Sequence, residues 1–338
     1  MTFREPSGNS NGLTRDKKGS APPIIQMNST SSLTTTLPEV LSGILPTPED
    51  TLFLRACLTP GESGKLASEA WLEQHQNRFK KEAIKAFLPL LLRATQKHGV
   101  KVDATFLTVL RTATLREELR TNTYKRICGD VFLALSDQTI PTIVLGGAAL
   151  ADTVYADPAL RHSHDIDVLI PDMQFSRTGS LIASLRFKFV KVSDAGSHHW
   201  EFKHASGLPL QLHSRLFQLP CYTPSFAELW SRSQNLLLAG VSVRTLSPAD
   251  SLLYVCGHAS YSGNRHSLRW ASDAWFIIDR YPDLDWDLLL NYARRSRLTL
   301  SLSVMLRYLA EALDASIPPA VMADLLASPG NRRNGKST

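Results

Sequence analysis

The strongest constraint on the fold is a hydrophobic period that changes twice along the chain. Apolar residues recur at helical spacing up to about residue 138 and again from Pro248 onward. Between these parts, starting at Pro141, short β-branched runs alternate with glycine and proline. The pattern predicts an α+β fold, in which a small mixed β-sheet within 139–246 is flanked by helical regions at 46–138 and 247–327.

Both ends of the chain lack this periodicity. Residues 1–45 are rich in Ser and Thr with few apolar residues, so they cannot offset the entropy of ordering and are predicted to be disordered. Residues 328–338 are predicted to be a flexible basic tail.

Individual elements follow from the same patterns. A helix is expected to start at Thr47-Pro48-Glu49-Asp50 and to end before Pro60-Gly61, and a long helix is expected over 104–137. In the middle we predict strands at 142–145, 166–170, 187–192, 198–202 and 208–213, with a helix over 148–155. The C-terminal helices are predicted near 248–260, 266–280, 285–296, 299–313 and 318–327.

Two aspartates stand at the start of one of these strands. Side chains alternate along a strand, so Asp165 and Asp167 should project to one side while Ile166 and Val168 project to the other. Adjacent carboxylates repel each other, and a hard divalent cation such as Mg²⁺ removes that repulsion. For the motif alone, a solvated strand start is the simpler interpretation.

The glycine pair upstream favours the metal-site interpretation of the two aspartates over a solvated strand start. The strand ending at Leu145 runs into Gly146-Gly147 and then a helix, and free N–H groups at a helix N-terminus attract phosphate. A phosphate cradle close to a metal site is the layout that phosphoryl transfer needs. Taken alone, the glycine pair would indicate only a tight turn.

The order of these motifs resembles a known group of enzymes. Leu145-Gly146-Gly147 followed by Asp165-Ile166-Asp167-Val168 resembles the signature of the DNA polymerase beta-like nucleotidyltransferase superfamily. More closely, residues 48–326 resemble the bacterial uncharacterised nucleotidyltransferase family. Further matching segments are Tyr155, Asp157-Pro158, Arg161, Leu210–Leu216, His258, Leu268–Asp273 and Leu284-Asp285-Trp286.

The resemblance implies transfer of a nucleoside monophosphate from an NTP, with ATP as the expected donor, and release of pyrophosphate. It implies that Asp165 and Asp167 bind Mg²⁺, or Mn²⁺ in its place, and that Gly146 and Gly147 cradle the phosphates. Arg161 is expected to offset phosphate charge, and Gln211 and His213 to lie at the nucleotide. The acceptor is left open among small molecules, peptides or proteins and, with less support, a nucleic acid end.

Two positions depart from the family pattern. Gly146 stands where members commonly have Lys, and Gln211 stands where a third metal-site acid is usual. An amide brings no negative charge and cannot deprotonate a hydroxyl. Strand parity places Glu201 on the same face as Gln211, so Glu201 is a hypothetical substitute and a candidate catalytic residue. The alternative function is therefore a nucleotide-binding or interaction protein that keeps the fold without the chemistry.

Other residues admit structural interpretations. Six histidines, namely His162, His164, His198, His199, His204 and His213, gather around the predicted site without convincing zinc spacing, so polar or orienting roles are expected. A salt bridge from Arg161 to Asp157 or Asp165 would be its structural role. Arg269 and Asp273 are four residues apart and are expected to pair with each other.

Charge and cysteine content add little about the chemistry. The net charge of +6 suits an anionic ligand without requiring one, and interleaved basic and aromatic motifs typical of RNA binding are missing from the sequence. Four scattered cysteines form no CxxC pair and are interpreted as buried free thiols. With no membrane-spanning apolar segment expected, a cytoplasmic location is predicted.

Overall fold

The structure is a computed structural model that describes residues 43–76, 82–192, 198–217, 223–262 and 267–327. Contacts divide the chain into residues 1–36 and 37–338, and every described residue belongs to the second unit. The C-terminal tail predicted at 328–338 lies outside the described residues, as does all but the end of the tail predicted at 1–45.

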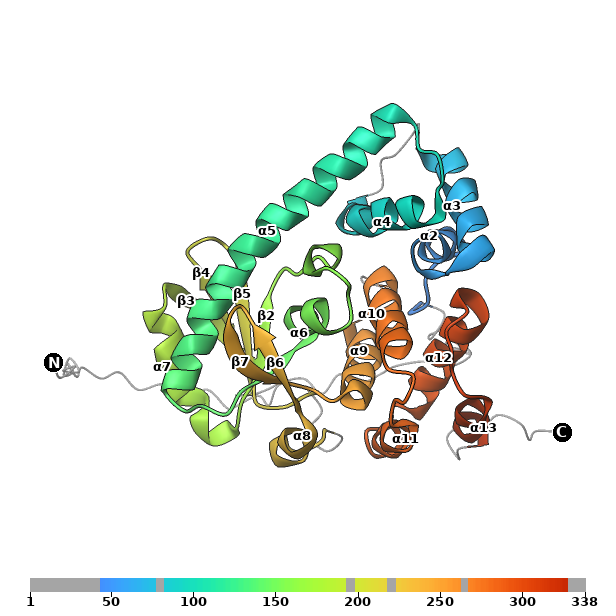
Figure 1. The fold of residues 1–338 in the computed structure, drawn as a ribbon. Helices are drawn as coiled ribbons and strands as arrows, with labels where there is room; N and C mark the ends of the chain where they lie inside the picture. The colour runs from blue at the N-terminus through green and yellow to red at the C-terminus, as the bar shows by residue number, and fades with distance from the viewer. Residues whose placement is uncertain (1–42, 77–81, 193–197, 218–222, 263–266, 328–338) are drawn as a thin grey trace, which may run out of the picture. The chain divides into compact units, whose positions relative to one another are not determined.

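A seven-stranded mixed sheet occupies the middle of the chain (Figure 1). Its order is β3-β4-β5-β2-β1-β7-β6, with β2 parallel to β5, β1 parallel to β7, and the other neighbours antiparallel. The strands are β1 (Ile143–Leu145), β2 (Ile166–Leu169), β3 (Phe187–Val192), β4 (His199–His204), β5 (Pro209–His213), β6 (Gln234–Leu238) and β7 (Val241–Thr245).

One face of this sheet is covered by helices α5 (Ala104–Asp137) and α7 (Phe175–Ser184) (Figure 1). Ile166 and Val168 of β2 are fully buried there in one apolar cluster with Phe132 of α5 and Ile182 of α7. Because side chains alternate along a strand, Asp167 between them points to the opposite face. Burying two branched side chains thus determines the direction of the aspartates, as the sequence predicted.

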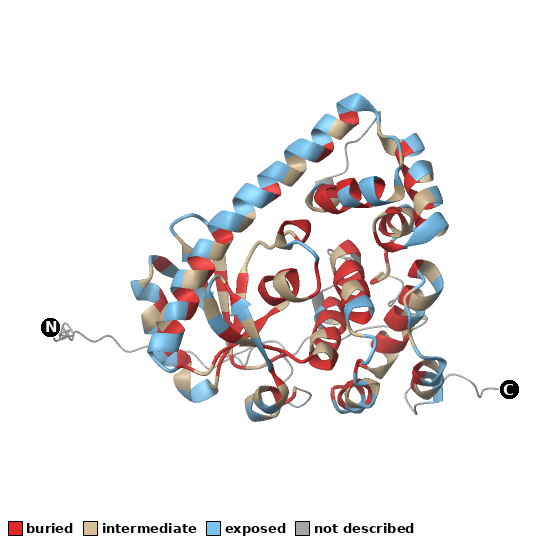
Figure 2. Cartoon of the chain, in the orientation of Figure 1, coloured by how far each residue is buried: buried red, intermediate tan, exposed pale blue. Residues whose placement is uncertain are grey.

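Apart from α5, the helices on the two sides of the sheet in sequence form one helical body. Helix α2 contacts both α10 and α12, Trp270 donates a hydrogen bond to the Ile44 carbonyl at 3.0 Å, and Thr51 bonds to Tyr308 at 2.9 Å. Figure 2 shows the buried sides of these helices turned toward one another. The helices are α2 (Pro48–Leu58), α3 (Gly61–His75), α4 (Leu88–His98), α9 (Pro248–Ser262), α10 (Ser267–Arg280), α11 (Trp286–Arg295), α12 (Thr299–Leu313) and α13 (Pro319–Ala327).

The expected elements are confirmed, with a few additions. Thr47 caps α2 by accepting the Asp50 N–H at 3.2 Å, α5 spans the expected range, and the five expected strands and five C-terminal helices are present. The helix expected over 148–155 is α6 (Gly146–Thr153), which starts two residues earlier. The additional elements are β6, β7, α7, α8 (Phe226–Arg232) and the short 3₁₀ turns η1 (Glu82–Phe87), η2 (Pro158–Leu160) and η3 (Asp172–Gln174).

The hairpin β6–β7 shows why part of the sheet was missed. Ala239 and Gly240 at its turn have φ values of 52° and 81°, the left-handed pair that a tight hairpin needs. Leu237 on β6 is 71% exposed, so the strand lacks the clean apolar alternation that identifies a strand in sequence. Pairing with β1 across the sheet holds this hairpin in place.

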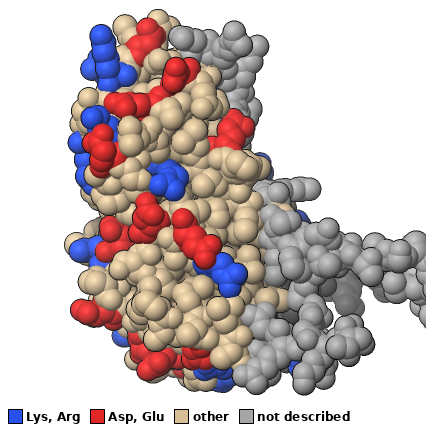
Figure 3. All heavy atoms as spheres, turned by 90° about the vertical axis from the view of Figure 1, so that its right-hand side faces the viewer, with Lys and Arg blue, Asp and Glu red and all other residues tan. Residues whose placement is uncertain are grey.

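The described residues also bear on the expectations from composition. No helix among them is long and apolar enough to cross a membrane. Cys57, Cys128 and Cys256 are free thiols, and Cys221 lies outside the described residues. On the face in Figure 3, acidic and basic side chains are interspersed, so the positive excess is not gathered into one patch among the described residues visible there.

Candidate active site

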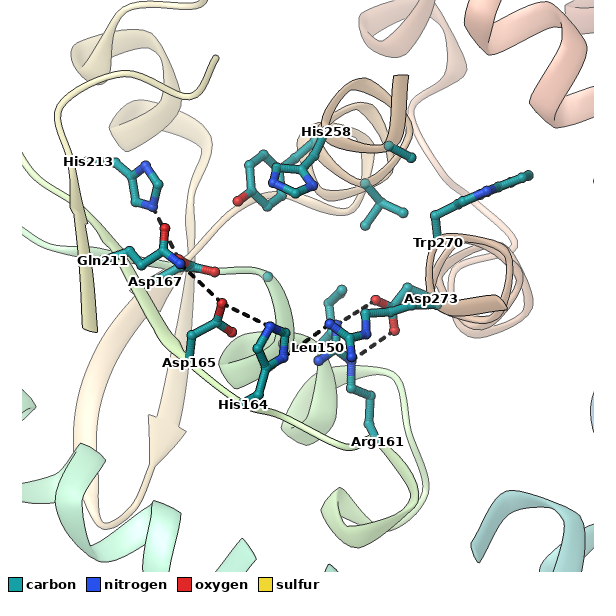
Figure 4. Close-up of a pocket in the computed structure, with 16 residues that line it drawn as sticks. Leu150, Arg161, His164, Asp165, Asp167, Gln211, His213, His258, Trp270 and Asp273 are labelled. Carbon is teal, nitrogen blue, oxygen red and sulfur yellow. Dashed lines mark hydrogen bonds and ion pairs between the residues drawn. The ribbon is translucent and has the colours of Figure 1, made fainter. Parts of the chain in front are cut away.

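A cavity of about 270 Å³ lies between the open face of the sheet and helices α9 and α10 (Figure 4). Its sheet wall consists of residues from β2, β5 and the turn after β1, and its helical wall consists of residues from α9 and α10 together with Arg161. The sheet wall contains Gly146, Gly147, Asp165, Asp167, Gln211 and His213; the helical wall contains Arg161, Tyr254, Val255, His258, Ala259, Arg269, Trp270 and Asp273. Leu150 of α6 and His164, which comes just before β2, also line the cavity.

The two aspartates lie together on the sheet wall, as the sequence predicted. Asp167 is opposite Gln211 of β5 and opposite Leu145 of β1 in the strand register. Burial raises the pKa of the Asp167 carboxyl to about 6. Burial also raises the pKa of Asp165, and the adjacent Asp167 carboxylate adds to this rise. The site therefore holds two carboxylates whose ionised forms are destabilised, which is the electrostatic condition that a bound cation relieves.

The segment before β2 is held by one face of α5. Tyr124 donates a hydrogen bond to the Asp165 carbonyl, Arg120 donates to the Ser163 carbonyl at 2.9 Å, and Glu117 pairs with His162 at 2.9 Å. Residues three, four and seven positions apart lie on the same side of a helix, so α5 contacts this segment at three successive points. Sequence reasoning missed these positioning residues, because the helix was identified from its apolar residues and its polar side chains gave no sign of their partners.

Gln211 is fixed by hydrogen bonds on both sides of its amide. Its Nε2 donates to Asp165 Oδ2 at 3.4 Å, and its Oε1 accepts from His199 Nε2 at 2.7 Å. The amide therefore presents its N–H, rather than its oxygen, to the carboxylate pair. The donor arrangement stabilises the ionised carboxylate of Asp165 but does not add a third oxygen ligand.

His213 belongs to the same wall. Its Nε2 lies 3.2 Å from Asp167 Oδ1, and its ring stacks on His199 with 4.6 Å between centroids. Burial lowers the pKa of His213 to about 4, so at neutral pH the ring is uncharged and donates its Nε2–H to Asp167. The placement of His213 beside the acids matches its predicted position, and its role at the nucleotide stays a prediction.

Arg161 crosses to the helical wall. Its Nε and Nη2 donate to the two carboxylate oxygens of Asp273 at 3.2 and 2.8 Å, and both side chains are more than nine-tenths buried. Tyr155 donates to the same carboxylate at 2.7 Å. The salt-bridge partner is thus neither Asp157 nor Asp165. The pairing of Arg269 with Asp273 expected from their spacing was also wrong, because the bidentate contact from Arg161 occupies the carboxylate.

Glycine is required at positions 146 and 147 for different structural reasons. Gly146 has φ +54°, and a Cβ there would lie 3.3 Å from Asp167 Oδ2. A Cβ on Gly147 would lie 2.2 Å from Arg161 Nη1, closer than any side chain can approach. Helix α6, which starts at Gly146, has no side-chain cap on its first turn. The turn therefore brings backbone close to both the acids and the arginine.

The other predicted residues lie outside the cavity. Glu201 is opposite Gln211 in the register of β4 and β5, which confirms the predicted parity, but its carboxylate pairs with Lys191 at 3.7 Å and it does not line the cavity. His198 bonds to Ser214, and His204 bonds to Ser206. Of the six clustered histidines only His164 and His213 line the cavity.

The oxygen donors at the sheet wall suit a divalent cation. Two adjacent carboxylates at an open cavity fit a hard ion such as Mg²⁺ that takes its other ligands from water and phosphate. Among the residues described, no three His, Cys, Asp or Glu side chains are grouped so that they could hold a metal by themselves. The residues therefore fit a cation shared with a ligand rather than a closed structural site.

Comparison with protein families gives one match. The model of the family described as uncharacterised nucleotidyltransferase matches residues 83–314, which include both walls of the cavity. This range is shorter at both ends than the 48–326 of the sequence resemblance. No curated protein matches the chain.

Several solved structures are similar in fold. The antibiotic-resistance factor ANT(2″)-Ia in solution is 14% identical, with a TM-score of 0.38 over 55% of this chain and 96% of that chain. An antigenic nucleotidyltransferase-like protein from Paracoccidioides brasiliensis is 20% identical, with a TM-score of 0.39 over 59% and 96%. The lincosamide antibiotic adenylyltransferase LnuA with lincomycin bound is 12% identical, with a TM-score of 0.35 over 45% and 94%. Similarities of this size do not identify a substrate.

Proposed function

We infer that the chain, which belongs to the uncharacterised nucleotidyltransferase family, transfers a nucleoside monophosphate from an NTP to an acceptor and releases pyrophosphate. The observation that supports this most directly is the position of Asp165 and Asp167, side by side on the cavity wall next to the Gly146-Gly147 turn. Phosphoryl transfer depends mainly on positioning and charge neutralisation, and this wall offers groups for both.

Asp165 and Asp167 are the residues that would hold Mg²⁺, or Mn²⁺ in its place. Bound there, a divalent cation would neutralise phosphate charge and orient the α-phosphorus for in-line attack. Gln211 and His213 serve this pair by donating hydrogen bonds to Asp165 and Asp167, which keeps each carboxylate in one orientation. Tyr124 also orients Asp165, by donating a hydrogen bond to its backbone carbonyl.

The phosphates are proposed to lie against the first turn of α6. Gly146 and Gly147 line the cavity, and backbone N–H groups at a helix N-terminus bind phosphate oxygens. Arg161 supports this turn from behind, since its guanidinium packs against Gly147 while Asp273 holds it. We therefore assign Arg161 mainly to positioning the turn and the loop, rather than to direct phosphate contact.

The reaction on this arrangement is the substitution of one P–O bond by another. An acceptor hydroxyl attacks the α-phosphorus, the new P–O bond forms, and the bond to the β-phosphate breaks with pyrophosphate leaving. The hydroxyl proton leaves to water, because Gln211 has no carboxylate to accept it. We propose ATP as the donor and a small molecule as the acceptor, since the cavity has a volume of about 270 Å³ and helices α9 and α10 bound one side of it. A peptide, protein or nucleic acid end is the other acceptor class.

One observation favours a second candidate function. Because the Gln211 amide turns its N–H toward Asp165, the wall has two acids and a donor where three acids are usual in the resembled enzymes. A protein with this site could bind a nucleotide without transferring it. The hypothesis that Glu201 replaces the third acid requires its carboxylate to leave Lys191 and enter the cavity.

The direct test is a transfer assay. Purified protein is incubated with α-labelled NTPs, Mg²⁺ or Mn²⁺, and a panel of hydroxyl acceptors, and labelled products and pyrophosphate are measured. We expect metal-dependent turnover that falls about 1000-fold in the Asp165→Asn/Asp167→Asn double variant, because several kcal/mol of charge stabilisation are lost. Circular dichroism checks that the variant is folded, and full activity in it would refute the site.

Gln211→Glu separates the two candidate functions. If the chain is a transferase whose activity is limited by the lack of a third acidic metal ligand, Gln211→Glu should increase both metal affinity and turnover. Glu201→Ala, on the neighbouring strand, tests whether Glu201 supplies that ligand. If wild type binds nucleotide without turnover and only Gln211→Glu transfers, the second candidate is correct. Activity lost in Glu201→Ala would instead support the substitution of Glu201 for the third acid.

A further inference from the structure

Two arginines line the cavity, and they differ in how their charge is balanced. Arg161 forms its bidentate pair with Asp273 and is neutralised inside the wall. Arg269, one helical turn before Asp273 on α10, has no carboxylate within 4.0 Å among the residues that the structure describes. The carboxylate that its spacing would provide is already occupied.

The hydrogen bond that Arg269 makes with His164 shows where its guanidinium lies relative to the acidic pair. Its Nη1 lies 3.1 Å from His164 Nδ1, and a guanidinium can only donate, so His164 Nδ1 is the acceptor. The proton of the neutral ring is therefore on His164 Nε2, which faces Asp165 Oδ2 at 3.4 Å. Arg269 is thus connected to the acidic pair through one uncharged ring.

The charged form of the Arg269 guanidinium is destabilised by its surroundings. Burial lowers the pKa of its guanidinium, and the nearby Arg161 lowers it further. A partly buried cation that faces a cavity is stabilised by an anion that enters it, and the planar fork of arginine matches the oxygens of a phosphate group. The His164 imidazole that accepts from Arg269 carries no negative charge, so it does not supply that anion.

We propose that Arg269 is a phosphate-binding residue of the helical wall and that it contacts a phosphate group of the bound ligand from the side facing Asp165. The ligand class rests on the proposed function, in which the triphosphate of the donor nucleotide is the first source of this phosphate. A phosphorylated acceptor is the second source with the same chemistry. On this assignment the sheet wall and α6 hold one part of the phosphate chain and α10 holds another.

The test is calorimetric binding by the full-length protein, without acceptor and in EDTA, of ATP, AMP, inorganic tripolyphosphate and adenosine. We expect Arg269→Gln to weaken binding of phosphate-bearing ligands about 10- to 100-fold while adenosine binding is unchanged, since a hydrogen bond to a charged group is lost. Arg269→Lys should recover part of the affinity, because lysine keeps the charge but not the fork. Arg177→Gln, which alters an exposed arginine bonded to Gln138, is the matched control and should change nothing.

The pattern of losses identifies the source of the phosphate. Weaker ATP binding with unchanged AMP places Arg269 at the β- or γ-phosphate, and loss for both places it at the α-phosphate. Loss for tripolyphosphate with unchanged ATP assigns it to the phosphate of an acceptor. Equal binding of all four ligands by wild type and Arg269→Gln would overturn the proposal, as would failure of wild type to bind any phosphate-bearing ligand.

Failure of the proposed transfer is recognised separately. The Asp165→Asn/Asp167→Asn variant should lose turnover but keep its tripolyphosphate affinity in EDTA, because Arg269 is intact and two repelling carboxylates are gone. If wild type shows no turnover while Arg269→Gln still weakens phosphate binding, the phosphate site holds and the transfer reaction does not.

Discussion

The sheet wall and the helical wall of the cavity are built in opposite ways. On the sheet wall, two ionisable acids lie next to each other and the neighbouring groups are uncharged donors such as Gln211 and His213. On the helical wall, the buried charge of Arg161 is matched by Asp273 through two hydrogen bonds. The acidic pair of the sheet wall is therefore not compensated within the protein, whereas the Arg161–Asp273 pair of the helical wall is.

The difference indicates which wall serves the fold and which serves the ligand. A paired buried charge contributes to a unique arrangement of the chain, and here it joins the segment before β2 to α10. Adjacent carboxylates destabilise the folded protein until a cation arrives. Substitutions in the Arg161–Asp273 pair should therefore mainly lower stability, whereas substitutions of the two aspartates should mainly change metal binding and chemistry.

The largest expected effect is on the helical wall. Asp273→Asn leaves the Arg161 guanidinium, 8% exposed, without a counter-charge, so the free energy of unfolding should fall by about 3–5 kcal/mol. Denaturant unfolding measures this change. Asp324→Asn is the control, because its pair with Arg294 is 44–45% exposed and should contribute less than about 1 kcal/mol. Equal losses in the two variants would show that Arg161 and Asp273 are not the compensated pair described.

A smaller change in stability, opposite in sign to that of Asp273→Asn, is expected when Asp167 on the sheet wall is substituted. The pKa of Asp167 is raised from 3.8 to about 6 in the folded protein, so between these values the folded state binds more protons than the unfolded state. Stability in EDTA should therefore fall as pH rises from about 4 to about 6, and Asp167→Asn should remove about 1–3 kcal/mol of this fall.

Thermal or denaturant unfolding across this pH range, with and without Mg²⁺, measures the effect. Above pH 6 the metal should restore stability to wild type but not to Asp167→Asn, because the ion binds the ionised carboxylate. An unchanged pH slope in the variant would remove the electrostatic distinction between the walls.

The smallest change is expected for Tyr124→Phe, and it distinguishes a role in positioning the site from a role in stability alone. Tyr124→Phe removes the hydrogen bond to the Asp165 carbonyl and should lower stability by about 1 kcal/mol and kcat about tenfold, since groups that orient metal ligands affect chemistry. Tyr308→Phe loses a comparable hydrogen bond to Thr51 in the helical body and should lower stability equally with kcat unchanged. Steady-state kinetics with NTP measures the contrast, and equal kcat values would mean that α5 does not position the site.

Much of the sheet wall could be predicted from the sequence, because strand alternation is a local property. The apolar residues Ile166 and Val168 fix the face of Asp167, and the same parity places Glu201 opposite Gln211. Where Glu201 directs its charge could not be predicted, since Lys191 reaches it from β3 across a strand pair. The α5 contacts were likewise invisible, because Tyr124 and Asp165 are brought together only when the helix lies along the sheet.

Local sequence patterns were thus sufficient to predict five of the seven strands, the helical regions on either side of them, the acidic pair and the glycine turn beside it. How the charges on the helical wall are paired depends on contacts between distant segments. Local spacing favours Arg269 for Asp273, yet Arg161, 112 residues away, takes that carboxylate with two hydrogen bonds. The physical reason is that a buried carboxylate is satisfied by the partner that can reach it bidentately away from water, and which partner that is depends on packing rather than on distance along the chain.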